Sequence, residues 1–160
     1  MILGGGGMLR ISKLADYGTV VMVYLAKRAQ MLCNARDIAF HTHLTVPTVS
    51  KLLKRLTAAG LLTSVRGVSG GYRLQRSAAE ISVAQIISAL EEQLGLTECS
   101  LDPNECALQE VCHVQGNWRL ISQAIETALD SVSLEELAKP SIRAVDLERI
   151  KQLASGVSHG

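Results

Sequence analysis

Three cysteines lie close together in the second half of the sequence, in the pattern Cys99-x6-Cys106-x5-Cys112, and His113 follows directly. Thiolates in this number can hold zinc or an iron–sulfur cluster when a further oxygen or nitrogen donor joins them. Structural zinc sites usually begin with a close C-x2-4-C pair, which this sequence lacks. The wide spacing therefore favours an iron–sulfur cluster. A thiol–disulfide switch formed by the same cysteines is the alternative interpretation.

The fourth cysteine, Cys33, stands alone near the end of a predicted helix. We expect it to be a buried small apolar residue and not a ligand. The adjacent pair Cys112 and His113 is not expected to act as a nucleophile and base, because neighbours on a loop lack the geometry that activates a thiol. The sequence therefore does not indicate an enzyme.

A second group of polar residues has the spacing of a helix that reads DNA. Pro47 suits the first position of this helix, and Gly60 is expected to end it. Apolar residues between them recur at i, i+3, i+4 and i+7, which leaves hydroxyls and cations for the opposite face. A recognition helix needs this division, because its polar face meets base edges and phosphates in the major groove. We predict DNA contacts from Thr45, Thr48, Ser50, Lys51, Lys54 and Arg55.

The residues after this helix have the pattern of a β-hairpin. Segments 61–65 and 72–74 are predicted strands, and residues 66–71 form a glycine-rich turn between them. Glycines let a backbone approach DNA closely, and an arginine can enter the minor groove. We predict that this wing contacts DNA through Arg66, Gly67, Ser69 and Gly70.

The elements that must position these residues are mostly helices. Helical spacing predicts one helix from Ser12 to about Gln30 and a second from Asn34 to His43, ahead of the recognition helix. Ser82 is expected to cap a fourth helix.

A long helix is predicted to begin near His113. Its apolar stripe comprises Trp118, Ile121, Ile125, Ala128, Leu129 and Val132, and a capping box at residues 133–136 starts a short helix that Pro140 ends. We expect the long helix to form a dimer, because a lone amphipathic helix must bury its stripe. An intramolecular partner is the alternative.

The predicted fold is mainly α with a small β-hairpin wing: a winged helix-turn-helix followed by a long dimerisation helix. Residues 1–8 would be a disordered leader or tag, 9–91 the DNA-binding domain and 92–112 the cysteine cluster loop. Residues 113–139 would be the dimerisation helix, and 140–160 a C-terminal tail.

The charge of the chain is divided between its two halves. Residues 1–78 carry 11 Lys and Arg against two Asp, a net +9, and residues 79–160 carry five against 13 acidic residues, a net −8. A basic half suggests an anionic partner, and nucleic acid is the obvious one. No apolar run is long enough to span a bilayer and no signal peptide opens the chain, so we expect a cytoplasmic protein without membrane contact.

Three stretches resemble the Rrf-two family of bacterial winged-helix regulators. These are LRISKLADY at 9–17, SVRGVSGGYRL at 64–74, and the three cysteines before Trp118. The Ala-Asp-Tyr opening and the Leu-Thr-Glu-Cys sequence at 96–99 are most similar to regulators of the SUF iron–sulfur assembly system. The resemblance implies a homodimer, a palindrome-like double-stranded DNA operator and a 2Fe–2S cluster held by Cys99, Cys106 and Cys112.

The resemblance leaves the fourth cluster ligand open. Some members complete the site with a histidine three residues after the third cysteine, and that position is Gln115 here. Other members use an acidic residue of the first helix, donated by the other subunit, and the matching position is Asp16. Asp16 is thus the expected ligand, with His113 as the rival.

Together these features predict an iron–sulfur-sensing transcriptional regulator of iron–sulfur assembly genes, with repression favoured over activation. A thiol-redox or zinc-stabilised DNA-binding regulator without iron is one alternative. A thiol enzyme is a weaker one, since it would need a cysteine of lowered pKa in a pocket.

Overall fold

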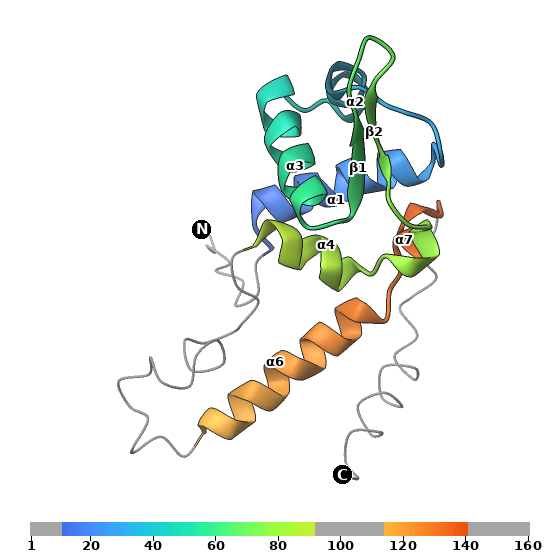
Figure 1. Ribbon diagram of the computed structural model, residues 1–160. Coiled ribbons are helices and arrows are strands. Elements are labelled where there is room, and N and C mark those ends of the chain that lie inside the picture. Colours follow the sequence, from blue (N-terminus) through green and yellow to red (C-terminus); the bar gives the residue numbers. More distant parts are fainter. Residues whose placement is uncertain (1–10, 92–113, 141–160) are drawn as a thin grey trace, which may run out of the picture.

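The computed structural model describes residues 11–91 and 114–140 (Figure 1). A head of short helices and one hairpin comes first, and a long helix extends from this head. A short final helix then packs back against the head. The elements are α1 (Lys13–Ala26), α2 (Ala35–Thr42), α3 (Val46–Ala58), β1 (Leu62–Val65), β2 (Gly71–Leu74), the 3-10 helix η1 (Ala78–Glu80), α4 (Val83–Leu90), α6 (Gln115–Asp130) and α7 (Leu134–Ala138).

Five of the helices begin where a side chain accepts a hydrogen bond from the unpaired N–H groups of the first turn. Ser12, Asn34, Thr45, Ser82 and Ser133 are the N-caps, and each accepts from the backbone N–H three residues later. The helix starts predicted at Ser12, Asn34, Ser82 and Ser133 are therefore confirmed. The recognition helix begins one residue earlier than predicted, at Val46.

The first helix is shorter than predicted and ends at Ala26. The next residues form a turn in which the N–H of Arg28 donates to the carbonyl of Leu25, and Gln30 has a left-handed φ of 70°. A helix cannot continue through that backbone conformation. The side chain of Arg28 lies back over the ring of Tyr24, with 3.8 Å from the guanidinium carbon to the ring centroid.

The core of the head is aliphatic, as the aromatic content of 3% predicts. Its residues come from helices α1 to α4 and α7, from β1, and from Cys33, Leu61 and Ile81 between these elements. The largest fully buried side chains are Met22, Leu25, Ile38, Leu52, Leu53, Leu56, Leu62, Ile81, Ile86, Leu90, Leu134 and Val21.

The two strands pair antiparallel, with Leu62 opposite Leu74 and Val65 opposite Gly71. Cys33 adds an isolated bridge to this hairpin, because its N–H donates to the Tyr72 carbonyl at 3.0 Å and its carbonyl accepts from the Tyr72 N–H at 2.9 Å. Cys33 is 6% exposed, which confirms its predicted burial. Three helices followed by a hairpin confirm the winged-helix fold.

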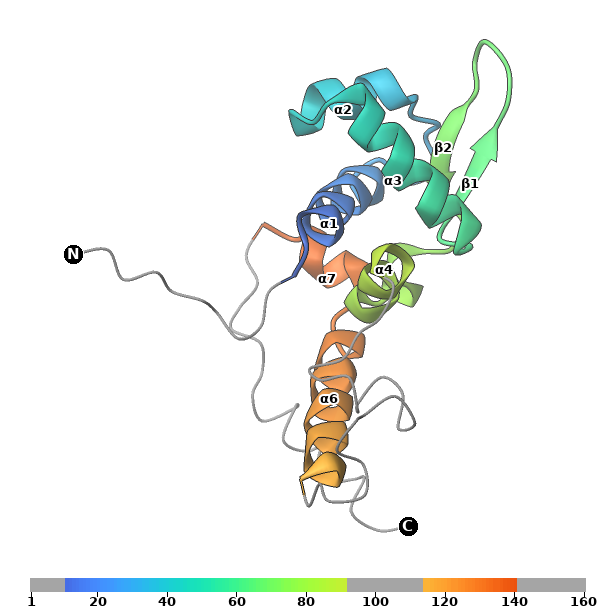
Figure 2. The same ribbon diagram turned by 90° about the vertical axis from the view of Figure 1, so that its left-hand side faces the viewer.

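The long helix α6 projects away from the head, and only its C-terminal end lies near α4 (Figures 1 and 2). The chain then turns back, and α7 packs against α1 and η1 with Leu134 fully buried. The sequence grouped residues 113–139 as one dimerisation element. In the structure, residues 134–138 pack against the head, where Leu134 joins its core.

Candidate nucleic-acid interface

Helix α3 divides into two faces, as a recognition helix must. Val49, Leu52, Leu53 and Leu56 are 0% exposed and pack into the head. The side chains of Ser50, Lys51 and Lys54 are exposed. A cationic and hydroxyl-bearing surface thus lies on an otherwise well-anchored helix, which suits contacts with phosphates and base edges.

The N-terminus of α3 carries two linked hydroxyls. Thr45 caps the helix by accepting from the Thr48 N–H at 3.4 Å, and the two hydroxyl oxygens lie 2.8 Å apart. Thr45 is exposed and Thr48 is half-buried. Because the N-terminus of a helix carries partial positive charge and free N–H groups, this end can receive a phosphate.

The turn between β1 and β2 protrudes past α2 and α3 in both views (Figures 1 and 2). Arg66, Val68 and Ser69 are exposed in it. Gly67 has a φ of +117°, and a Cβ at Gly70 would collide with the Val65 carbonyl oxygen. The turn closes through a 3.0 Å bond from the Gly70 N–H to the Gly67 carbonyl. Gly67 and Gly70 are therefore required for the shape of this turn.

Arg55 has a different environment from its neighbours on α3. It is half-buried, and its Nη1 donates to the backbone carbonyl of Leu90 at 2.7 Å. The sequence placed Arg55 with the polar face because its type and spacing fit. Its partner lies 35 residues away on α4, and no local pattern indicates such a contact.

Arg36 and Arg73 are among the exposed cations of the head that were not singled out from the sequence. Arg36 lies in the first turn of α2, and Arg73 lies on β2 opposite Thr63. The alternation of side chains along a strand was the available signal for Arg73, since Tyr72 and Leu74 on either side of it are half-buried.

The predicted cluster ligands Cys99, Cys106 and Cys112, and the rival His113, lie outside the described residues. Asp16 is exposed on the first turn of α1, and no described residue donates a hydrogen bond to its carboxylate. Within residues 11–91 and 114–140, no three His, Cys, Asp or Glu side chains gather as metal ligands. Asp16 is therefore the one predicted ligand whose position is known, and its carboxylate is accessible.

The end of α4 lies close to the start of α1. Glu91 is the last described residue before the cysteine-containing segment, and its Oε1 accepts from the backbone N–H of Ser12 at 3.1 Å. Ser12 caps the helix turn that carries Asp16. The chain thus enters that segment at the end of α1 where the predicted fourth ligand lies.

Cys33 has the properties of a structural cysteine. Burial raises the pKa of its thiol, Arg28 opposes this shift and Asp37 adds to it. The thiol, a weak hydrogen-bond donor, donates to the Met31 carbonyl at 3.9 Å. A buried thiol of raised pKa is a poor nucleophile and a poor candidate for metal binding.

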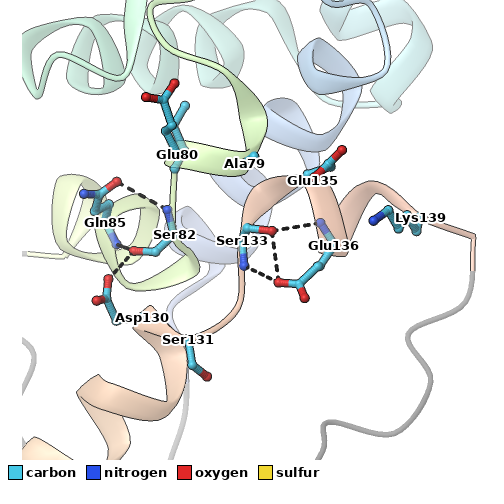
Figure 3. Close-up of a pocket in the computed structure, with 11 residues that line it drawn as sticks. Ala79, Glu80, Ser82, Gln85, Asp130, Ser131, Ser133, Glu135, Glu136 and Lys139 are labelled. Atoms are coloured by element: carbon cyan, nitrogen blue, oxygen red, sulfur yellow. Dashed lines mark hydrogen bonds between the residues drawn. The ribbon is translucent and has the colours of Figure 1, made fainter. Parts of the chain in front are cut away.

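An open hollow of about 500 Å³ lies where α4, α6 and α7 meet (Figure 3). Its polar side chains bond to each other: Ser82 Oγ donates to Asp130 at 2.6 Å, and Ser133 and Glu136 form a capping box. Backbone bonds join the same corner, from the Val83 N–H to Val132 and from the Leu134 N–H to Ile81. This corner therefore fixes the direction in which α6 leaves the head.

Among the described helices, none combines the length and apolar character needed to cross a membrane.

Comparison with known proteins shows what this chain is similar to. Residues 11–140 match the family model Rrf2, described as an iron-dependent transcriptional regulator. A relative from Xenorhabdus nematophila, the HTH-type transcriptional regulator IscR, is 34% identical over 132 residues, which are 82% of this chain and 80% of the relative.

Solved structures with a similar fold include CymR and IscR. CymR, the global cysteine regulator of B. subtilis, has a TM-score of 0.66 at 30% identity and covers 84% of this chain and 99% of its own. IscR of T. potens has a TM-score of 0.65 at 31% identity, with coverages of 85% and 90%. The family model spans the head, which carries α3 and the wing, and also α6 and α7. The chain belongs to the Rrf2 family of transcriptional regulators.

Proposed function

We propose that the chain is a homodimeric, iron–sulfur-sensing regulator that binds a palindrome-like DNA operator and represses iron–sulfur assembly genes. The observation that carries the DNA-binding part is the exposed face of α3, with Ser50, Lys51 and Lys54, on the same head as a protruding wing. In this proposal the exposed residues Thr45, Ser50, Lys51, Lys54, Arg66, Gly67 and Ser69, with the half-buried Thr48 and Gly70, form the DNA surface.

The dimer is proposed from the uneven burial of α6. Its C-terminal residues Ala128 and Leu129 are half-buried against the head, whereas Trp118 and Ile121 of the same predicted stripe are 36% and 45% exposed. The described residues leave this apolar N-terminal half uncovered. A second copy of α6 would bury it, and the two heads would then lie on adjacent half-sites of DNA.

The cofactor is proposed from the donor set. Cys99, Cys106 and Cys112 would supply three thiolates, and the accessible carboxylate of Asp16 would supply a hard oxygen donor, a combination that suits iron. A bound 2Fe–2S cluster supplies a redox-active iron centre. Similarity to proteins named IscR and to a family described as iron-dependent supports this assignment.

A thiol-responsive DNA-binding regulator without iron is the second candidate. It is favoured by one finding, the structural similarity to the global cysteine regulator CymR. In this case the same three cysteines would act through oxidation and not through metal binding.

Anaerobic purification with iron, zinc and sulfide analysis separates the two candidates. A coloured protein with iron and acid-labile sulfide is expected, and Cys99→Ala, Cys106→Ala and Cys112→Ala should each lose iron. Cys33→Ala is the matched control and should keep it, because Cys33 is buried in the head. A colourless protein without iron, or iron loss in Cys33→Ala with retention in Cys106→Ala, would contradict the cluster proposal.

A further inference from the structure

Arg55 occupies the recognition helix but is turned toward the interior of the head. Lys51 and Lys54 on the same helix are exposed, whereas Arg55 is half-buried and donates from Nη1 to the Leu90 carbonyl at 2.7 Å. A hydrogen bond of this length from a cation belongs to the stronger class of protein hydrogen bonds. The bond joins α3 to the last residue of α4.

The bond meets a need at the C-terminus of α4. The last four carbonyls of a helix have no partner within the helix, and Leu90 is the final residue of α4. This end also carries partial negative charge, which a nearby cation stabilises. Helix α4 has no basic residue in its own last turn. Arg55 therefore supplies from α3 both the donor and the charge that α4 lacks.

Leu90 is also the point where three helices are packed together. Its side chain is 2% exposed and lies directly against Gly18 of α1, so closely that a Cβ at Gly18 would collide with Leu90 Cδ1. The side chain of Leu52, from α3, is the next neighbour of that position. Packing against α1 thus fixes the position of Leu90. The hydrogen bond from Arg55 then holds α3 against this fixed residue.

We propose that Arg55 is a positioning residue, which orients the recognition helix by binding the C-terminal end of α4 and does not contact DNA. This inference rests on the proposed DNA-binding function. It predicts that loss of Arg55 changes the orientation of α3 relative to the head without removing a phosphate contact. Lys54, its exposed neighbour, provides the matched comparison, because neutralising it removes the same charge from the same helix.

The test compares Arg55→Gln with Lys54→Gln on a duplex that the wild-type protein selects from a random-sequence pool. Removing one phosphate-binding cation flattens the slope of log affinity against log salt by roughly one unit. Lys54→Gln should show this flattening. Arg55→Gln should bind the selected duplex about tenfold more weakly, the effect of removing one hydrogen bond to a charged group, yet keep the wild-type slope.

Amide hydrogen exchange provides a second readout that needs no DNA. Arg55→Gln should speed exchange in α3 and in the last turn of α4, including the Glu91 N–H that bonds to Ile87, whereas Lys54→Gln should not. A slope flattened by one unit, or exchange unchanged from the wild type, would overturn the inference. If the wild type selects no duplex, the proposed function fails, and exchange alone still decides the role of Arg55.

Arg55→Lys covers the case in which Arg55→Gln does not fold. It keeps a charge and a donor, so exchange at the end of α4 should lie between the wild type and a chain without the bond. Exchange at or near the wild-type rate, with wild-type affinity and slope, would show that the lysine ammonium replaces the donor and charge at the end of α4, as the positioning role requires. Weaker DNA binding with wild-type exchange would instead indicate that the Arg55 guanidinium contacts DNA, and would overturn the positioning role.

Discussion

Lys51 on α3 and Arg66 in the wing are exposed cations on two separate elements of the proposed DNA surface. We expect Lys51→Gln and Arg66→Gln each to weaken DNA binding, since each removes one positive charge that faces solvent. A phosphate contact would flatten the salt dependence by roughly one unit of slope, whereas a base contact would cost roughly 1–3 kcal/mol and relax specificity. Titration at several salt concentrations distinguishes them.

The control for this experiment is Lys27→Gln, an exposed cation just after α1 and outside the proposed surface. It should leave the salt slope unchanged. Unaltered affinity in both Lys51→Gln and Arg66→Gln would remove the DNA-binding surface assigned to α3 and the wing.

The thiol of Cys33 should react slowly with iodoacetamide near neutral pH. Burial raises its pKa, so the reactive thiolate is scarce until the pH rises well above the range of an ordinary cysteine. Alkylation should therefore accelerate as the pH increases, with its midpoint above that of the urea-unfolded chain. Peptide mass spectrometry separates Cys33 from the other cysteines, and equal rates in folded and unfolded chains at pH 7 would contradict the burial argument.

Residue types and spacing were enough to predict the environment of some side chains but not of others. The cap at Ser12 and the exposure of Lys51 follow from local patterns, because both depend on one helix. Arg55 has the same type and spacing as a DNA-facing residue, yet its environment is decided by α4, 35 residues further along. Local sequence cannot contain that information.

At the scale of elements, the turn of the wing depends on Gly67 and Gly70. A Cβ at Gly70 would collide with the Val65 carbonyl oxygen and with the backbone of Arg66 and Gly67. Because these are backbone atoms, no side-chain rotation can relieve the collision. We expect Gly70→Ala to rearrange the turn and weaken DNA binding, with a loss of stability of about 1–3 kcal/mol from backbone strain. Thermal unfolding and DNA titration measure the two effects.

Val68→Ala is the matched control in the same turn, because the Val68 side chain is fully exposed and is not expected to stabilise the fold. It should leave the unfolding temperature close to that of the wild type. A Gly70→Ala variant as stable and as tightly bound to DNA as Val68→Ala would show that the wing does not need this backbone shape.

Element boundaries were predictable where a capping residue marks them and less so elsewhere. Asn34 and Ser82 mark the starts of α2 and α4, and both were predicted. No comparable signal marks the end of α1 at Ala26, where a turn with a left-handed Gln30 replaces the last predicted helical turn. Likewise Asp130, 48 residues from Ser82, could not be matched to it from sequence.

At the scale of the whole molecule, the corner between α4, α6 and α7 connects the DNA-binding head to the proposed dimer helix. Ser82, Asp130 and the paired backbones of residues 81–83 and 132–134 hold α6 at one angle to the head (Figure 3). In a dimer formed through α6, that angle would determine the separation of the two recognition helices. The half-site spacing that the dimer binds would then depend on this corner as well as on α3.

The last prediction concerns Asp16, the proposed fourth ligand donated across the dimer. Its carboxylate is exposed on the first turn of α1, and its other role there is to offset the helix N-terminal charge, worth about 0.3–1 kcal/mol. Asp16→Ala should therefore leave the metal-free protein folded while it alters the visible spectrum and speeds loss of iron. His113→Ala should change neither property.

Mixed dimers test whether the ligand crosses between subunits. In a dimer of one Asp16→Ala subunit and one Cys106→Ala subunit, cross-dimer ligation leaves one complete site, with cysteines from the first subunit and Asp16 from the second. Ligation by Asp16 of the same subunit leaves none, and the His113→Ala variant tests the rival ligand separately. The mixed dimers that retain iron are thus expected to have the visible spectrum of the wild-type protein. A spectrum altered as in Asp16→Ala dimers, or one that shifts with His113→Ala instead, would place the fourth ligand within the same subunit. The two subunits would then be joined by packing of α6 alone, and metal loading would have no direct bond through which to alter the spacing of the two heads.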